Sequence, residues 1–371
     1  MTGMQTELQP SKRTTIKTLQ SSRFIFVLLI FLSHCALVEN GAAFDYGGEA
    51  GVAFFFVLSG FVLSFGYGEK IDDGSFSTRS FMAKRLAKIY PLHILLLVIA
   101  VVFDARLGMG YTVWQILSGI MLVQTWTMSE NYIYVANGVA WFLCDMMFLY
   151  IIFKPLYKFV ARASVRTLCA VGIVVLVAYV VFALQVPDNE LNSKLYTNPL
   201  LRSIDFALGI AMFRFYRSRR SKTLCTSLAE SKVCKANMVE LAAILLLAAS
   251  CVAYYSMSKT FRLAMLFWLV MPLVVYIIAV TDNTRALVSR FLHTRPMLWL
   301  GGISFEIFLT HRIVMRVTLH FVAPWGNIAM MCISYALAFA FTVAVSWALR
   351  QWFVMSIYNK VSRCVNKPYI S

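Results

Sequence analysis

Two residues in the first apolar run have side chains that could move a proton or bind a charged ligand. Arg23 begins the run RFIFVLLIFLSHCALV, and His34 lies eleven residues later. On an α-helix this separation is about 1100°, or three turns plus roughly 20°, with a rise of about 16 Å. The two side chains therefore share one helix face. An apolar environment favours the uncharged imidazole that a general base requires, although an interhelical hydrogen bond would also explain a histidine here.

The second apolar run contains small residues that could pack helices together or border a substrate. Ser59 and Gly60 are adjacent, and Ser64 follows four residues after Gly60. A small-x-x-x-small pair lets two helices approach closely, so a packing seam would explain the pair without any chemistry. The basic loop that follows holds Arg85 and Lys88. These two cations could bind phosphates, or they could only mark the cytoplasmic side of a membrane.

Ionisable side chains inside apolar runs are costly, so each of them is a candidate for function. Arg202 and Asp205 are three residues apart, and a local ion pair is the simpler explanation of Asp205. The complete set is His34, Asp145, Asp205, Glu306, His311, Arg312 and Arg316.

The late members of this set allow more than one interpretation. Arg312 and Arg316 can extend toward the outer headgroups. His311 fits either an interhelical hydrogen bond or a functional role. Asp145 could orient a polar partner near the outer face, and Glu306 has no obvious partner in the sequence.

The composition is that of a polytopic membrane protein. Of the 371 residues, 60% are hydrophobic and 14% are charged, whereas soluble domains are about 45–50% apolar and about 25% charged. The net charge of +17 does not indicate nucleic-acid binding, because the basic residues cluster in short segments between apolar runs. The eight cysteines are scattered without metal-type spacing, so no metal site is expected.

Eleven apolar runs predict an all-α fold with about ten transmembrane helices and both termini in the cytoplasm. Basic and poorly basic loops alternate along the chain. The alternation holds only if the short run 113–126 enters the membrane without crossing it, as runs of about 10–14 residues often do. The expected parts are a polar cytoplasmic tail at 1–22, a membrane domain at 23–350 and a basic cytoplasmic tail at 351–371.

Four segments resemble motifs of the integral-membrane acyltransferase-3 family, which includes O-acyltransferases of O-antigen, exopolysaccharide and peptidoglycan. The resemblance covers about residues 20–350. In chain order the segments are Arg23 followed after ten residues by His34, FFVLSG at 55–60, RLAKIYP at 85–91 and LGGISFEIFLTH at 300–311. Two positions depart from the family pattern. Lys88 replaces an arginine and lacks its bidentate fork, and Asp145 lies four residues after Trp141, where the family often has a glutamate five residues after a tryptophan.

The resemblance implies an acyl-CoA donor, usually acetyl-CoA, and an acceptor hydroxyl on an envelope glycan or its lipid-linked precursor. It also implies a multi-pass protein of the plasma membrane, with no bound cofactor. Together with the ionisable residues above, it gives the candidate site. The catalytic candidates are Arg23, His34, Asp145 and His311, and the donor-binding candidates are Ser59, Gly60, Arg85, Lys88 and Tyr90.

In the expected reaction, His34 removes the proton of the acceptor hydroxyl as the hydroxyl attacks the thioester. A two-step route through an acyl-histidine is also compatible with the sequence. The alternative function is a proton-coupled transporter that uses His34, Asp145, Glu306 and His311 as a relay, although no inverted repeat is visible. A non-catalytic membrane scaffold is a third possible function. The sequence determines neither the acceptor, nor the acyl chain, nor the oligomeric state.

Overall fold

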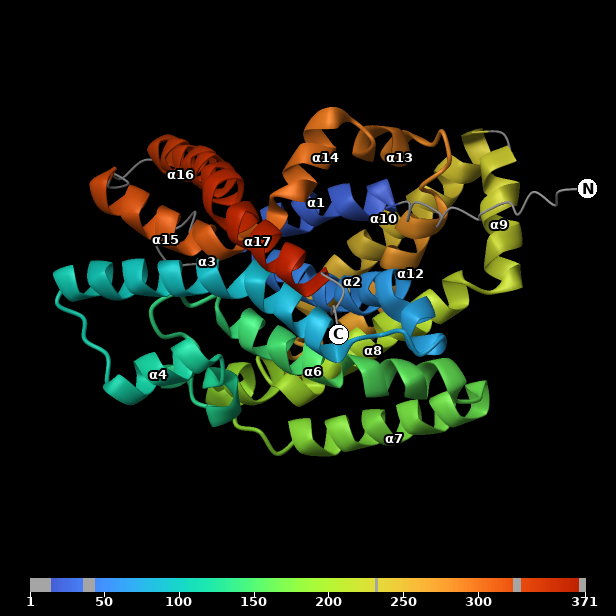
Figure 1. Ribbon diagram of the computed structural model, residues 1–371, viewed down its shortest axis with the longest axis horizontal. Coiled ribbons are helices and arrows are strands. Elements are labelled where there is room, and N and C mark those ends of the chain that lie inside the picture. Colours follow the sequence, from blue (N-terminus) through green and yellow to red (C-terminus); the bar gives the residue numbers. More distant parts are fainter. Residues whose placement is uncertain (1–14, 36–43, 231–232, 323–327, 367–371) are drawn as a thin grey trace, which may run out of the picture.

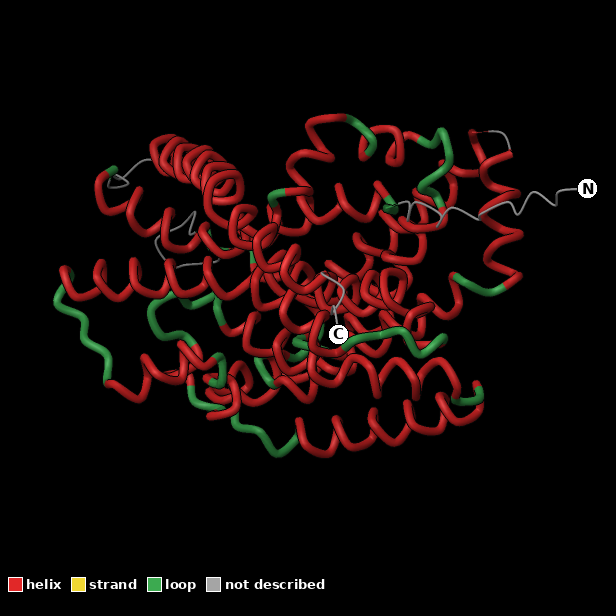
Figure 2. The backbone as a smooth tube through the Cα atoms, in the orientation of Figure 1, coloured by secondary structure: helices red, strands yellow, loops and turns green. Residues whose placement is uncertain are grey.

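The computed structural model describes residues 15–35, 44–230, 233–322 and 328–366 (Figure 1). Across these four segments the regular structure is entirely helical, as Figure 2 shows. The predicted all-α class is confirmed for the described residues. Residues 1–14 of the predicted N-terminal tail and residues 367–371 of the predicted C-terminal tail lie outside them.

Seventeen α-helices make up the described chain. They are connected by short loops, by 3₁₀ turns at Gln124–Thr127 and Asp188–Glu190, and by π-helical turns at Asn192–Tyr196 and Arg350–Val354. The helices are α1 (Lys17–Ser33), α2 (Asp45–Asp72), α3 (Thr78–Arg106), α4 (Val113–Met121), α5 (Glu130–Ile133), α6 (Trp141–Arg162), α7 (Val165–Ala183), α8 (Pro199–Tyr216), α9 (Arg219–Glu230), α10 (Val233–Ser256), α11 (Lys259–Arg262), α12 (Met265–Val280), α13 (Leu287–Leu292), α14 (Arg295–Gly302), α15 (Ser304–Phe321), α16 (Ile328–Leu349) and α17 (Met355–Asn366).

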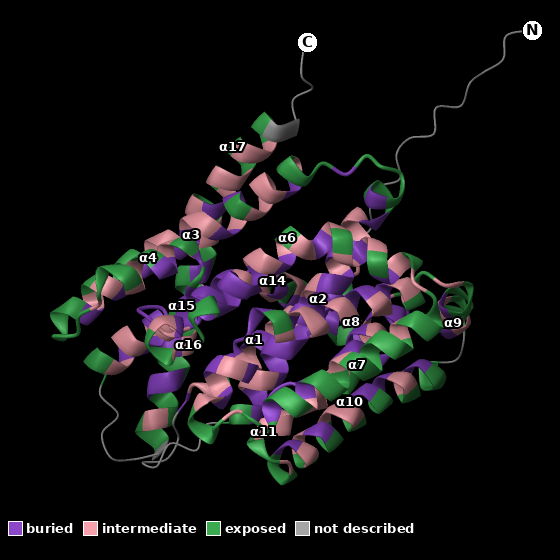
Figure 3. Ribbon diagram, turned by 90° about the horizontal axis from the view of Figure 1, so that it is seen from below, coloured by how far each residue is buried: buried purple, intermediate pink, exposed green. Residues whose placement is uncertain are grey.

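Helix α2 lies at the centre of the bundle and packs against α1, α6, α8 and α12. In its most apolar stretch, 67% of the residues are buried, against 6% in α7. Figure 3 shows the same difference, with α1 and α2 inside the bundle and α7 and α10 at its surface. A helix that exposes apolar residues all round its surface is typical of a lipid-facing span.

Glycine allows the closest of these helix contacts. A Cβ atom on Gly60 of α2 would lie 2.1 Å from the carbonyl oxygen of Phe206 on α8, and a Cβ atom on Gly209 of α8 would lie 2.0 Å from the carbonyl oxygen of Val57. The two backbones thus approach to a distance that only glycine permits. The packing interpretation of Gly60 is therefore supported.

Six helical segments of the described chain are long and apolar enough to cross a membrane: α2, α3, α7, α10, α11 with α12, and α16 with α17. Helices α14 and α15, bent by 66° at their junction, would together make a seventh. Helices α1, α6 and α8 are not among them, since α1 has 17 residues and the other two carry several charges each, such as Asp145 and Lys154 in α6 and Arg202 and Asp205 in α8. These three helices pack against other helices rather than against lipid, so their surfaces need not be apolar. The total of ten spans stays a prediction.

The predicted non-crossing run contains α4, a helix of nine residues. Nine residues rise about 14 Å, less than half of a hydrocarbon core of about 30 Å. Leu122 then takes a left-handed conformation with φ of 53° and ends the helix. Helix α4 is therefore too short to cross a bilayer.

Both predicted tails contain ordered helix. Helix α1 begins at Lys17, six residues before the predicted start of the membrane domain at Arg23. At the other end, α17 continues beyond the π-helical turn at Arg350–Val354 and packs on α3. Residues 355–366 thus belong to the folded body.

The α2–α8 contact can be tested with a pair of glycine substitutions. Gly60→Ala should lower the melting temperature of the purified protein, because the new methyl group forces the two helix backbones apart. Gly172→Ala in α7 is the matched control, since a Cβ atom there meets nothing within 4 Å. That variant should be as stable as the unchanged protein or slightly more so, because alanine favours a helix over glycine by roughly 0.5–1 kcal/mol. Equal melting temperatures for the two variants would contradict the contact.

Candidate active site

His34 lies at the C-terminal end of α1, immediately after the last helical residue, Ser33. Its Nδ1 atom is 2.7 Å from the carbonyl oxygen of Ile30. A carbonyl oxygen only accepts hydrogen bonds, so Nδ1 carries the proton and donates. In the neutral imidazole, Nε2 is then the unprotonated nitrogen. This tautomer leaves Nε2 free to accept a proton.

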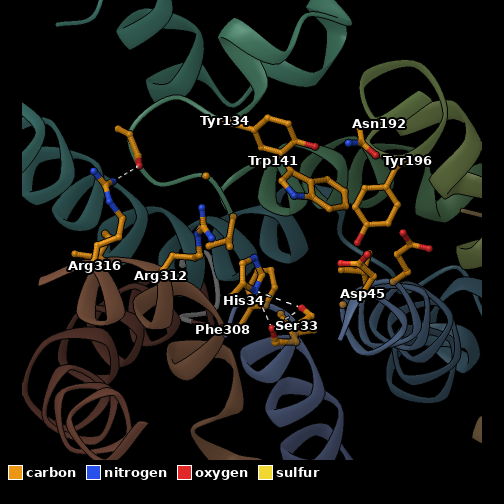
Figure 4. Close-up of a pocket in the computed structure, with 18 of the residues that line it drawn as sticks. Ser33, His34, Asp45, Tyr134, Trp141, Asn192, Tyr196, Phe308, Arg312 and Arg316 are labelled. Atoms are coloured by element: carbon orange, nitrogen blue, oxygen red, sulfur yellow. Dashed lines mark hydrogen bonds between the residues drawn. The ribbon is translucent and has the colours of Figure 1, made fainter. Parts of the chain in front are cut away.

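His34 lines a cavity of about 520 Å³, here called the His34 cavity. Figure 4 shows Tyr134 and Trp141 across from the imidazole, with Arg312 on one side and Asp45 on the other. The other polar side chains of the wall are Ser33, Glu49, Tyr111, Asn192, Tyr196, Lys259, Arg262 and Arg316. A space of this size, with aromatic rings and converging polar groups, has the character of a small-molecule site.

His311 lies beside His34 rather than in the cavity wall. The two ring centroids are 5.1 Å apart, in an edge-on arrangement. His311 is fully buried, its Nδ1 donates to the carbonyl oxygen of Phe308 at 2.6 Å, and its Nε2 has no hydrogen-bond partner in the described part of the chain. The sequence allowed either a structural or a functional role for His311. In the structure, His311 lies next to His34, the predicted base.

Arg316, which also lines the His34 cavity, is paired within the protein, and this corrects the expectation that it extends toward the headgroups. Arg316 forms an ion pair with the fully buried Asp104 of α3, and the hydroxyl of Tyr111 donates to the same carboxylate. Arg316 also donates to the carbonyl oxygen of Ala136 at 3.4 Å. It is therefore engaged within the protein instead of extending to headgroups. Sequence reasoning missed Asp104, because 212 residues separate it from Arg316.

A second cavity, of about 120 Å³, brings together four of the predicted residues. Arg23 of α1, Ser59 of α2 and both Arg85 and Lys88 of α3 line this Ser59 cavity. Its remaining walls are mainly apolar, and they include Phe55, Leu58, Phe142 and Phe308. Among the described residues, Phe308 is the one that lines both this cavity and the His34 cavity.

The cations of the Ser59 cavity have no carboxylate partners in the described segments. Arg85 donates to the hydroxyl of Tyr67 at 3.3 Å and lies over the rings of Tyr67, Phe81 and Tyr150. The Lys88 ammonium lies 5.8 Å from the centre of the Phe305 ring. A narrow apolar cavity with unbalanced positive charge favours an anionic ligand that also has an apolar part.

A third cavity, of about 220 Å³, adjoins the second. Arg85 and Lys88 line both, and the third, here called the Glu306 cavity, adds Lys84, Glu306 and Arg350. Glu306 accepts from the Arg350 guanidinium at 3.2 and 3.3 Å. Glu306, for which the sequence offered no obvious partner, therefore has one: Arg350, at the start of the π-helical turn after α16 and 44 residues later in the chain.

The remaining candidates lie away from these cavities. Gly60 faces the backbone of α8 while its neighbour Ser59 faces the Ser59 cavity. The Tyr90 hydroxyl donates to the carbonyl oxygen of Ile120 at 2.9 Å, which attaches α3 to α4. Asp145 is fully buried in the first turns of α6 and lines none of the three cavities. Any part that Gly60, Tyr90 or Asp145 plays in a reaction would be indirect.

The predicted ion pair of Arg202 with Asp205 is present. Its atoms are 2.9 Å apart, and the two side chains are 1% and 0% exposed. Arg202 also donates to the carbonyl oxygens of Tyr196 at 2.6 Å and Leu263 at 3.0 Å. A buried guanidinium with this many partners connects α8 to its neighbours, and its role is structural.

Comparison with known proteins gives the family. The acyltransferase domain model of the family Acyl_transf_3 matches residues 16–351, nearly the whole chain. The chain belongs to the acyltransferase-3 family. The family resemblance predicted from the four motifs is confirmed. The matched region begins just before α1 and ends in the π-helical turn after α16, so it contains every residue that lines the His34 and Ser59 cavities.

Two relatives cover part of this acyltransferase-3 chain. Acyltransferase MdmB of Streptomyces mycarofaciens is 31% identical over 237 residues, which are 56% of this chain and 59% of MdmB. Protein 2 in picA locus of Rhizobium radiobacter is 46% identical over 46 residues, which are 12% of this chain and 24% of that protein. This chain thus spans about three-fifths of the length of MdmB. No solved structure matches it.

The ion pair of Asp104 with Arg316 gives a stability prediction. Asp104→Asn should destabilise the protein by on the order of 2 kcal/mol, because it leaves a guanidinium that is only 31% exposed without its carboxylate. Adding Arg316→Leu should recover part of the loss, since no unpaired charge then remains. The measurement is the melting temperature of the two single variants and the double variant.

The control for this cycle is the exposed pair of Lys194 with Glu190, whose side chains are 34% and 40% exposed. Lys194→Ala should cost no more than about 0.5 kcal/mol. Two results would show that the pair of Asp104 with Arg316 does not stabilise this wall of the His34 cavity. One is a loss of stability for Asp104→Asn as small as that for Lys194→Ala, and the other is a loss for the double variant equal to the sum of the losses of its two single variants.

Proposed function

We propose that the protein transfers an acyl group from acyl-CoA, with acetyl-CoA as the principal donor, to a hydroxyl group of an envelope glycan or its lipid-linked precursor. The observation that carries the proposal is the succession of three neighbouring cavities, each of which shares wall residues with the next. The Glu306 cavity shares Arg85 and Lys88 with the Ser59 cavity, which shares Phe308 with the His34 cavity. Cations without ion-pair partners lie at one end of this row of cavities, and a histidine base lies at the other. This arrangement matches the phosphate charges and the length of a CoA thioester.

The donor enters from the end of the bundle that holds Arg85, Lys88 and Arg350, which the distribution of basic residues predicts to be cytoplasmic. Phosphate oxygens are strong acceptors for arginine and lysine, and Arg23, Arg85 and Lys88 lack carboxylate partners within the described residues. Arg23 is about 16 Å below His34 along α1. The pantetheine arm has about thirteen bonds from sulfur to phosphorus and spans about 15 Å when extended.

His34 is the general base of the proposed reaction. Nε2 takes the proton of the acceptor hydroxyl while the hydroxyl oxygen forms a bond to the thioester carbonyl carbon. The carbon–sulfur bond then breaks, and the imidazolium returns the proton to the departing thiolate. The products are an ester and free CoA, so atoms and charges balance. The bond from Nδ1 to the Ile30 carbonyl holds the ring in the tautomer that this step needs.

The acceptor occupies the His34 cavity in this proposal. Trp141, Tyr134 and Tyr196 provide ring surfaces, and Asn192 and Asp45 provide hydrogen-bonding groups. This mixture suits a sugar, which presents apolar C–H faces and hydroxyl edges. Arg312 has no ion pair among the described side chains and adds positive charge where the carbonyl oxygen becomes negative. His311 supports the ring of His34 from behind. The proposed location is the plasma membrane, with the His34 cavity on the outer side.

The transporter alternative is less well supported by the arrangement of the relay candidates. His34 and His311 are neighbours, but Glu306 belongs to the Glu306 cavity and is paired with Arg350, and Asp145 lines none of the cavities. A proton relay requires groups within hydrogen-bond reach of one another or of shared water. Family membership also favours acyl transfer.

Replacing His34 tests the role of the base. His34→Gln can keep a hydrogen bond but cannot take a proton, so the rate of acyl transfer should fall by about 10²–10⁴. Membranes that contain the protein are supplied with labelled acetyl-CoA, and label in the glycan fraction is counted. Binding of acetyl-CoA and the melting temperature should be unchanged. His320→Gln, at the end of α15 and outside the three cavities, is the matched control. Near-normal transfer by His34→Gln would refute the mechanism.

Neutralising the two cations shared by the donor cavities tests donor binding. The double variant Arg85→Gln, Lys88→Gln should raise the apparent KM for acetyl-CoA by at least about tenfold, because two charge-assisted contacts to phosphate are lost. The maximal rate should change much less. The double variant Arg162→Gln, Arg166→Gln removes two basic residues that line none of the three cavities and should leave the KM unchanged. An equal KM in both double variants would make Arg85 and Lys88 topology markers only.

A further inference from the structure

Phe308 occupies the boundary between the two cavities in which donor and acceptor are proposed to meet. Its side chain lines both of them and is 4% exposed. It precedes His311 by one turn of α15, and its carbonyl oxygen accepts the hydrogen bond of His311 Nδ1. Figure 4 shows Phe308 next to His34 at the edge of the His34 cavity. Any group that passes from the Ser59 cavity to His34 must pass this ring.

Two further phenylalanines complete an aromatic wall with Phe308. The ring centroids of Phe308 and Phe142 are 5.0 Å apart, those of Phe308 and Phe55 are 6.3 Å apart, and those of Phe55 and Phe142 are also 6.3 Å apart. Phe55 and Phe142 line the Ser59 cavity alone. Three mutually packed rings from α2, α6 and α15 therefore close its end that faces His34.

The three rings limit the room for the acyl group of a donor held in the Ser59 cavity. Phe308, Phe142 and Phe55 all line this cavity, so an acyl group at the end of the pantetheine arm meets the aromatic wall. A chain longer than acetyl has no free space on the donor side of these rings. It would have to extend past Phe308 into the His34 cavity, where the acceptor is proposed to bind.

We propose that Phe308 determines which acyl chains the protein accepts and shields the thioester from the water of the His34 cavity. This inference rests on the proposed function. A small acyl group places its carbonyl at the edge of the ring, within reach of His34, whereas a longer chain collides with the aromatic wall. The shield is needed because His34 would activate water as readily as a sugar hydroxyl. Water would then form the new carbon–oxygen bond, the carbon–sulfur bond would break, and the products would be a free acid and CoA.

The test compares the binding of CoA, acetyl-CoA and hexanoyl-CoA to the purified full-length protein in nanodiscs. The unchanged protein should bind acetyl-CoA at least about tenfold more tightly than hexanoyl-CoA. Phe308→Ala should reduce that ratio by at least about tenfold, because the space left by the ring can bury the additional methylenes. Release of CoA from acetyl-CoA without acceptor, followed by chromatography, should also rise by at least about tenfold. Phe308→Leu, a milder change, should shift both quantities in the same direction.

The control is Phe153→Leu, because Phe153 is fully buried and lines none of the three cavities. It should change neither the binding ratio nor the release of CoA. If both Phe308 variants are folded and keep the ratio and the release of the unchanged protein, the inference is wrong although the proposed function can stand. If the unchanged protein binds neither CoA nor acetyl-CoA, the proposed function itself fails.

Discussion

Charged side chains inside a bundle that excludes water must be neutralised by groups of opposite charge. The described structure depends on which side chains are paired in this way. Three arginines are balanced by buried carboxylates: Arg202 by Asp205, Arg316 by Asp104 and Arg350 by Glu306. After these pairs are formed, Arg23, Arg85 and Lys88 remain around the Ser59 cavity without a carboxylate at ion-pair distance among the described residues. Positive charge of this kind is stable when a ligand or water supplies the missing negative charge. The cations without an ion-pair partner are therefore where the proposed donor is expected to bind.

Close packing of the central helices decides which side chains face the cavities. Ser59 and Gly60 are adjacent in α2, and a helix turns by about 100° per residue. Gly60 therefore meets the backbone of α8 while Ser59 lines the Ser59 cavity. The two residues of one short motif serve two purposes, and the glycine acts by fixing the angle at which its neighbour is presented.

Two helices run along the whole proposed path. Helix α1 supplies Arg23 to the Ser59 cavity and His34 to the His34 cavity. Helix α15 supplies Glu306, Phe308 and Arg312 to the three cavities in turn, and the two helices pack against each other. The residues proposed to bind the donor's charge and the residue proposed to move a proton are therefore held at fixed separations by helix geometry. In the proposed reaction, this arrangement would let one end of a long donor be bound in water while its other end reacts where water is restricted.

The sequence by itself determined the helical class, the membrane setting and the family, because apolar runs and local motifs depend only on residues that are near one another in the chain. It also determined the short α4 and the pair of Arg202 with Asp205, whose members are three residues apart. Only the tertiary structure decided the partners of Glu306 and Arg316, the convergence of Arg23 with Lys88, and the placement of Tyr90 and Asp145 away from the cavities. These features depend on which helices are neighbours and on how each is rotated about its axis, and no local pattern specifies either when the partners are 44 or 212 residues apart.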